Sequence, residues 1–220
     1  GWGTNFRSLV FSADQNADLL KASSWTASNS LGYDQEWETG NAWLEGNMVI
    51  GQDGDLFNFL RVNEKSRGGV AARIHVSPDG KALSFDPEKD FLYFPGGCKK
   101  FAIRYDEKTK RYWALSNHTH DIVYNPERTR NCLALSSSPG LLNWTVHKEI
   151  IYHPDFKLSG FQYPDWLFDG DDIIAVVRVA FDDGKEKPHN CHDANYIRFF
   201  RIVNYAENMH KNMARYINKH

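Results

Sequence analysis

Turn signals recur at short intervals along this chain, separated by short apolar or alternating segments. The turns are rich in Gly, Pro and Asp: QDGD at 52–55, SPDGK at 77–81, DEKTK at 106–110, SPG at 138–140 and FDGDD at 168–172. The segments beside them have the composition of strands: LFNFLRV, AARIHV, KFAIRY, RYWALS, IIAVVRV and YIRFFRIV. This series predicts antiparallel hairpins. Before the C-terminal tail, no segment keeps the apolar spacing of a long helix. We therefore expect an all-β fold.

Composition excludes two classes of partner. Hydrophobic residues make up 41% and charged residues 25% of the 220 residues, which is typical of a globular domain. The net charge of -2 lacks the basic excess of a nucleic-acid-binding protein. No apolar run approaches the roughly 20 residues that span a bilayer. We expect neither a nucleic acid nor a membrane as partner.

No cofactor or metal is indicated by the motifs. Cys98, Cys132 and Cys191 lie far apart without CxxC spacing, so we expect buried, small apolar side chains. The segment GGCKK at 96–100 lacks the Ser or Thr and the following helix of a phosphate-binding loop, and we interpret it as a turn leading into a strand.

Two segments resemble each other. ADLLKASSWTAS (17–28) and PGLLNWTV (139–146) both carry a Leu-Leu pair followed by Trp-Thr, and each follows a strand that ends in serine. Repeated hairpins favour a radial array of sheets. The two segments resemble degraded Asp boxes, the turns that mark the blades of sialidase-type β-propellers.

A second resemblance lies in residue spacing. Glu45, Val49, Asp53-Gly54, Leu56 and Arg61 match a strand pattern of bacterial exo-α-sialidases, with 61 minus 45 giving the family's offset of 16. Further on, Arg130 leads a strand ending in serine and Tyr163 follows 33 residues later, in the family's order. The resemblance implies that Tyr163 is a nucleophile, that Glu45 is its base, and that Arg61 and Arg130 hold the substrate carboxylate. It also implies a glycan substrate, no cofactor, and a secreted or periplasmic location.

These assignments have a physical basis. Arginine offers a rigid fork of donors to a carboxylate. A neutral phenol avoids the like-charge repulsion that a carboxylate nucleophile would meet at an anomeric centre bearing a carboxylate. We therefore expect Glu45 and Tyr163 within hydrogen-bonding reach. Other interpretations stay open: Glu45 and Arg61 as a surface ion pair, Arg130 in a solvated loop, and Tyr163 as a core aromatic.

The sequence also departs from the family pattern. Strand IIAVVR ends in Arg178 where sialidases carry an acidic residue, and the early segment offers only Arg7, Asp14 and Asp18 for a first arginine and an acid/base aspartate. At about 45 to 50 residues per blade, the chain holds four to five blades of a six-bladed propeller. We assign 1–205 to these blades and 206–220 to a polar, helical tail. Missing blades predict exposed apolar surface and a possible oligomer.

A further cluster, His189, His192 and Asp193, lies in KPHNCHDANY. Histidine beside aspartate can bind a metal or transfer protons near neutral pH, and we favour contact with a sugar over metal binding. The resemblance to sialidases thus implies a sialidase-like glycoside hydrolase that cleaves a terminal acidic or related sugar with retention. The alternatives are a non-catalytic glycan-binding propeller, or a neutral-sugar hydrolase or uronate lyase that uses His189 or His192.

Overall fold

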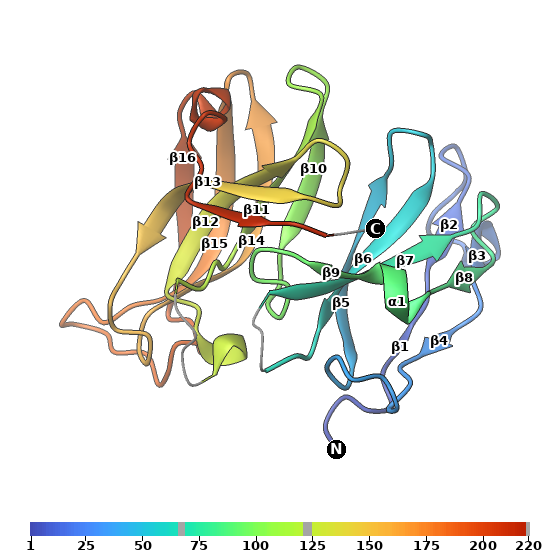
Figure 1. Cartoon of the computed structure of the whole chain (residues 1–220), viewed down its shortest axis with the longest axis horizontal. Coiled ribbons are helices and arrows are strands. Elements are labelled where there is room, and N and C mark those ends of the chain that lie inside the picture. Colours follow the sequence, from blue (N-terminus) through green and yellow to red (C-terminus); the bar gives the residue numbers. More distant parts are fainter. Residues whose placement is uncertain (66–68, 121–124, 219–220) are drawn as a thin grey trace.

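The computed structural model describes residues 1–65, 69–120 and 125–218 and shows an all-β protein (Figure 1). Its described residues form five antiparallel sheets, as the turn pattern predicts. The helices among these residues are single turns: α1 (Pro87–Asp90), η1 (Ala22–Ser24), η2 (Pro126–Arg128) and η3 (Tyr205–Asn208). None of them is long and apolar enough to cross a membrane.

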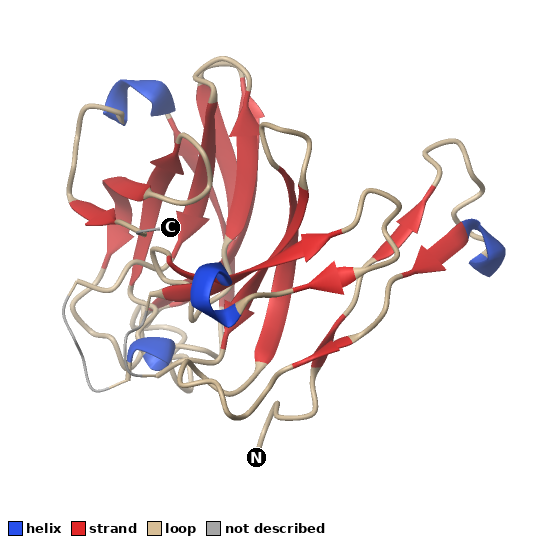
Figure 2. Cartoon of the chain, turned by 45° about the vertical axis from the view of Figure 1, so that its right-hand side comes forward, coloured by secondary structure: helices blue, strands red, loops and turns tan. Residues whose placement is uncertain are grey.

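Two small sheets come first. Strand β1 (Arg7–Ser8) pairs with β4 (Leu31–Gly32), and β2 (Phe11–Ala13) pairs with β3 (Trp25–Ala27). The β2–β3 hairpin projects away from the other sheets, with η1 near its tip (Figure 2).

The next sheet contains β5 (Trp43–Ile50), β6 (Leu56–Val62), β7 (Val70–Val76) and β8 (Leu83–Ser84), with β9 (Phe91–Tyr93) also paired to β7. The expected QDGD turn closes the β5–β6 hairpin, where Gly54 has a φ of +85°. Such a φ favours glycine, because a Cβ atom would clash with the backbone.

Two larger sheets complete the chain. One has the order β10 (Ala102–Asp106), β11 (Arg111–Ser116), β12 (Cys132–Ser138), β13 (Trp144–Tyr152), β17 (Ala214–Tyr216). The other contains β14 (Gly160–Asp169), β15 (Asp172–Ala180) and β16 (Tyr196–Ile202). The six strand-like segments of the sequence thus all contribute to strands.

The C-terminal tail does not form the expected helix. After η3, β17 pairs with the edge of β13 through Trp144 to Val146. Pairing with this edge provides hydrogen-bond partners for the backbone of the tail. A short, polar helix would lack tertiary contacts and would be only marginally stable. The helix prediction for this segment is therefore wrong, while the boundary at 205 stays a prediction.

The sheets stand side by side (Figure 1), and apolar side chains form cores between them. Trp113, Phe161 and Trp166 lie in the core between the β10–β13 and β14–β16 sheets. Phe59, Phe94 and Trp144 belong to the core on the other side of the β10–β13 sheet. A further core, around Trp43, joins the β5–β9 sheet to the N-terminal strands. The three cysteines are buried, as expected.

The two similar segments share one contact. The indole of Trp25 donates a hydrogen bond to the carbonyl oxygen of Leu19, and the indole of Trp144 donates to that of Leu141, at 3.0 and 2.9 Å. Both acceptors are the first leucine of a Leu-Leu pair. The two segments therefore share an indole-to-carbonyl contact, which spans six residues in the first segment and three in the second.

Candidate functional site

Glu45, Arg61, Arg130 and Tyr163 meet at one cavity of about 970 Å³. They come from different places in the chain: Glu45 from β5, Arg61 from β6, Arg130 from the segment before β12, and Tyr163 from β14. The cavity is lined by Gly1, Trp2, Phe6, Arg7, Asn41, Trp43, Leu44, Glu45, Arg61, Asn63, Lys65, Glu127, Arg128, Arg130, Tyr163 and His192.

The hydroxyl of Tyr163 donates a hydrogen bond to Glu45 Oε1 at 2.9 Å, within the expected reach. Glu45 also accepts two contacts from Arg61 Nη1, at 3.3 Å to Oε1 and 3.1 Å to Oε2. Arg61 Nη1 lies 3.5 Å from the Tyr163 hydroxyl oxygen. A phenol, its acceptor carboxylate and a guanidinium thus form one hydrogen-bonded group.

Tyr163 has an unusual backbone. Its φ of +51° is left-handed, and the residue lies at a register shift between Gln162 and Asp165, directly before Pro164. A bulky residue with positive φ is disfavoured, and such conformations cluster at functional sites. The bulge sets the position of Tyr163, which lines the cavity, and Arg178 on β15 lies 4.7 Å from the ring centroid.

Arg61 is held from three sides. Its side chain is 5% exposed, Nε donates to the carbonyl oxygen of Cys98 at 2.8 Å, and Nη2 contacts Glu127 Oε1 at 3.2 Å. Cys98 belongs to the GGCKK turn, which leads toward β10 as expected. A Cβ atom at Gly97 would lie 2.3 Å from the backbone of Val70, so this close approach of the turn to β7 requires glycine.

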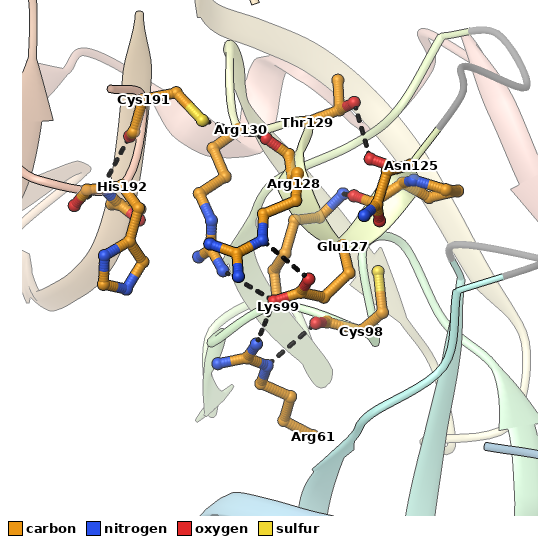
Figure 3. A network of polar contacts seen from close by, with 12 residues as sticks. Arg61, Cys98, Lys99, Asn125, Glu127, Arg128, Thr129, Arg130, Cys191 and His192 are labelled. Atoms are coloured by element: carbon orange, nitrogen blue, oxygen red, sulfur yellow. Dashed lines mark hydrogen bonds and ion pairs between the residues drawn. The ribbon is translucent and has the colours of Figure 1, made fainter. Parts of the chain in front are cut away.

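Glu127 joins the two arginines (Figure 3). Its Oε1 lies 3.2 Å from Arg61 Nη2 and 3.5 Å from Arg130 Nη2, and its Oε2 lies 3.3 Å from Arg128 Nε. The Arg130 side chain is 1% exposed, and its Nε and Nη1 have no hydrogen-bond partner among the described residues. Arg130 is thus a buried cation, and the solvated-loop alternative is wrong.

Burial and charge shift the titration of this group. Burial by itself would raise the pKa of Glu45, but the charge of Arg61 and hydrogen bonds from the backbone, Tyr163 and Arg61 lower that pKa below its usual value. Burial, reinforced by the charge of Glu45, raises the pKa of Tyr163. At neutral pH the pair is therefore a carboxylate and a neutral phenol. These are the forms needed for a base and for the nucleophile that the base activates.

The histidine cluster is divided. His192 lines the cavity, and its ring centroid lies 6.4 Å from that of Tyr163. Asp193 contacts both histidines, at 3.0 Å to His192 Nδ1 and 3.3 Å to His189 Nδ1. His189 and Asp193 are exposed and do not line the cavity.

Sequence reasoning missed several contributors. Glu127 lies three residues before Arg130 in the PERTRN segment, and that alternation of charges was the available signal. Arg178, noted as a departure, lies against the face of Tyr163. Of the early candidates, Arg7 lines the cavity and is held by Ser30, whereas Asp14 and Asp18 do not line it.

One group of described residues could hold a metal ion. The ligand atoms of His120, Cys132 and Glu149 all lie within 4.8 Å of one another. These three residue types are ligands for zinc. None of them lines the cavity, so this group does not bear on the chemistry of Glu45 and Tyr163.

No protein-family model and no curated protein sequence matches the chain. Its structure resembles the α-L-arabinofuranosidase Arb93A from Fusarium graminearum, with a TM-score of 0.51 and 9% identity over 92% of this chain and 51% of that one. The α-L-arabinanase of Penicillium chrysogenum has a TM-score of 0.48 and 11% identity, over 74% of this chain and 46% of the arabinanase. The intramolecular trans-sialidase of Ruminococcus gnavus has a TM-score of 0.46 and 16% identity, over 83% of this chain and 36% of the trans-sialidase.

The likeness to the arabinofuranosidase is one of fold. This chain spans about half the length of that enzyme, 51%. The fold is therefore one that a glycoside hydrolase uses, and the assignment of chemistry depends on the side chains in the cavity.

Proposed function

We propose that the chain is a sialidase-like glycoside hydrolase whose sheets are blades of a β-propeller, and that it cleaves a terminal acidic sugar with retention. The observation that carries this proposal is the 2.9 Å hydrogen bond from the Tyr163 hydroxyl to Glu45. Support for the fold comes from sheets that pack in series and from the likeness to a β-propeller glycosidase.

The proposed reaction begins at this pair. The Tyr163 oxygen attacks the anomeric carbon while its proton passes to Glu45, and a covalent glycosyl-tyrosine forms. Water then attacks the anomeric carbon, so two inversions give net retention. Arg178 beside the ring stabilises the phenolate charge that develops on Tyr163 when it leaves.

An acidic sugar fits the charge of the cavity. Five cationic side chains line it, against two carboxylates, which leaves three positive charges: 5 minus 2. The cations are Arg7, Arg61, Lys65, Arg128 and Arg130, and the carboxylates are Glu45 and Glu127. Arg61 and Arg130 would hold the sugar carboxylate, because guanidinium groups bind carboxylates with two parallel hydrogen bonds.

A neutral-sugar hydrolase is the second candidate, and one observation favours it. Glu127 already contacts the guanidinium groups of Arg61 and Arg130, so part of their charge is compensated without a ligand. Arb93A, which shares the fold, is an α-L-arabinofuranosidase. In this case Arg61 would serve to hold Glu45 instead of the substrate.

One assay separates these candidates. The chain is incubated with 4-methylumbelliferyl α-sialoside, α-L-arabinofuranoside and β-glucuronide, and the anomer released first is identified by proton NMR. Release from the sialoside with retention is the expected result. Turnover of the arabinofuranoside alone would replace the first candidate by the second, and binding of sialic acid without turnover would indicate a glycan-binding protein.

A further inference from the structure

The reaction proposed above requires a proton donor for the leaving group, and the two cavity carboxylates are both otherwise engaged. Glu45 accepts the proton of Tyr163. Glu127 contacts three guanidinium groups and serves as their shared counter-charge. Among the described residues that line the cavity, the remaining side chain of a type that titrates near neutral pH is His192.

The backbone of His192 is fixed to the strand that carries Tyr163. Its carbonyl oxygen accepts hydrogen bonds from Gln162 Nε2 on β14 and from Arg178 Nη2 on β15, both at 2.7 Å. Its amide donates to Asn190 Oδ1 at 2.7 Å. Gln162 directly precedes Tyr163 in the chain, so one residue couples the positions of the phenol and the imidazole.

The imidazole is oriented by Asp193. His192 Nδ1 lies 3.0 Å from Asp193 Oδ1. Hydrogen bonds from His192, His189 and Asn190 lower the pKa of Asp193 to about 2, so its carboxylate accepts and Nδ1 must donate. This leaves Nε2 as the atom that can exchange a proton. Figure 3 shows the imidazole directed away from Cys191, on the side where the guanidinium groups lie.

We propose that His192 is the acid/base residue of this site and that Asp193 is its positioning residue, an assignment that rests on the proposed function. The rings of His192 and Tyr163 are at 81°, with centroids 6.4 Å apart, which leaves room for an anomeric centre beside both. In retaining glycosidases the nucleophile and the acid/base residue flank the glycosidic bond, with their carboxyl groups about 5 to 5.5 Å apart, a separation of the same order.

When Tyr163 attacks, the glycosidic C–O bond breaks, and its electron pair goes to the leaving oxygen, which takes the proton from protonated His192 Nε2. In the second step, neutral His192 accepts a proton from water as the water oxygen bonds to the anomeric carbon. The bond to the Tyr163 oxygen breaks in the same displacement, its electron pair goes to that oxygen, and the resulting phenolate regains its proton from Glu45.

The test compares substrates with different leaving groups. Removing an acid catalyst slows the substrate whose leaving group needs a proton more than the substrate whose leaving group does not. The wild type and the His192→Gln, Asp193→Asn and His210→Gln variants are assayed for kcat/KM with a methylumbelliferyl sialoside and an alkyl sialoside. We expect His192→Gln to lose about 10²- to 10⁴-fold on the alkyl substrate, the usual contribution of a general acid. It should lose less than about 10-fold on the methylumbelliferyl substrate, whose leaving group needs no proton.

Asp193→Asn should show the same pattern more weakly, and His210→Gln, an exposed histidine outside the cavity, should match the wild type. Equal losses on both substrates, or no loss on either, would overturn the assignment of His192 while leaving the proposed function intact. A wild type that turns over neither sialoside would instead overturn the proposed function, and the assignment with it. Thermal melting confirms that each variant is folded.

Discussion

Tyr163 and Glu45 are 118 residues apart in the chain, and both line one cavity, where a 2.9 Å hydrogen bond joins them. Their strands, β14 and β5, belong to different sheets, so the contact depends on how the sheets are arranged. Side chains from several sheets converge in the same way where blades surround a common centre.

Tyr163→Phe should abolish turnover and preserve sugar binding, because it removes only the oxygen that attacks in the proposed reaction. We expect kcat to fall by at least about 10³-fold, within the range seen when a nucleophile is removed. Isothermal titration with the released sugar should give a Kd within a few-fold of the wild type. Tyr196→Phe removes an exposed hydroxyl bonded to Asp183 and should leave kcat unchanged. Residual activity of Tyr163→Phe near the wild-type level would exclude a tyrosine nucleophile.

Arg61→Lys should weaken binding of a carboxylated sugar, since a single ammonium group cannot reproduce a fork of donors. It also removes the bridge between Glu45 and Glu127. We expect KM for a sialoside to rise about 10-fold or more, the loss of one charge-assisted hydrogen bond. Arg201→Lys, at an exposed ion pair, is the matched control. Unchanged hydrolysis of a neutral glycoside by Arg61→Lys would support the second candidate.

The sequence predicted the strands well because alternating residues and Gly-containing turns are local signals. The turns at 52–55 and 168–172 close the β5–β6 and β14–β15 hairpins as expected. The tail was misjudged because β17 is stabilised by pairing with β13, a contact distant in sequence.

The candidate site was partly predictable because the spacing of its residues along the sequence is a readable signal. Spacing identified Glu45, Arg61, Arg130 and Tyr163, which the structure brings together. Spacing could not identify Glu127, because its role depends on three-dimensional contacts with two arginines from different elements. Nor could it show that His192 lies at the cavity while His189, three residues earlier, does not.

Glu127→Gln should destabilise the fold, because Arg61 and Arg130 would then be buried without this counter-charge. Removing one partner of a buried ion pair costs about 3 kcal/mol or more. For a chain of this size that corresponds to a decrease in Tm of about 6 to 12 °C. Glu107→Gln, at an exposed pair with Lys110, should change the stability by less than about 1 kcal/mol. Equal Tm values for the two variants, measured by calorimetry, would show that Glu127 contributes no such compensation.

Asp106 should make stability depend on pH in the acidic range. Burial alone would raise its pKa, but hydrogen bonds from Thr109, Tyr205 and the amides of residues 108 and 109 lower that pKa below its usual value. The folded state therefore binds fewer protons than the unfolded state, so the stabilisation is present at neutral pH and is lost as the pH falls below about 4. In urea unfolding, the difference between wild type and Asp106→Asn should shrink over this range. Asp14→Asn serves as the exposed control, and a difference independent of pH would contradict the assignment.

The outer face of the β14–β16 sheet should cause self-association. Leu167, Val176, Ile197 and Phe199 are 56%, 49%, 74% and 62% exposed, and Val176 pairs with Phe199 across the sheet, which places them on one face. Strand β16 is also an edge strand of its sheet. An exposed apolar face beside an open edge favours association between chains. Sedimentation velocity at increasing concentration should show a rising weight-average mass, and the double substitution Ile197→Lys, Phe199→Lys should restore a monomer without lowering Tm by more than a few degrees. A wild-type chain that stays monomeric over this concentration range would show that this apolar face does not drive self-association.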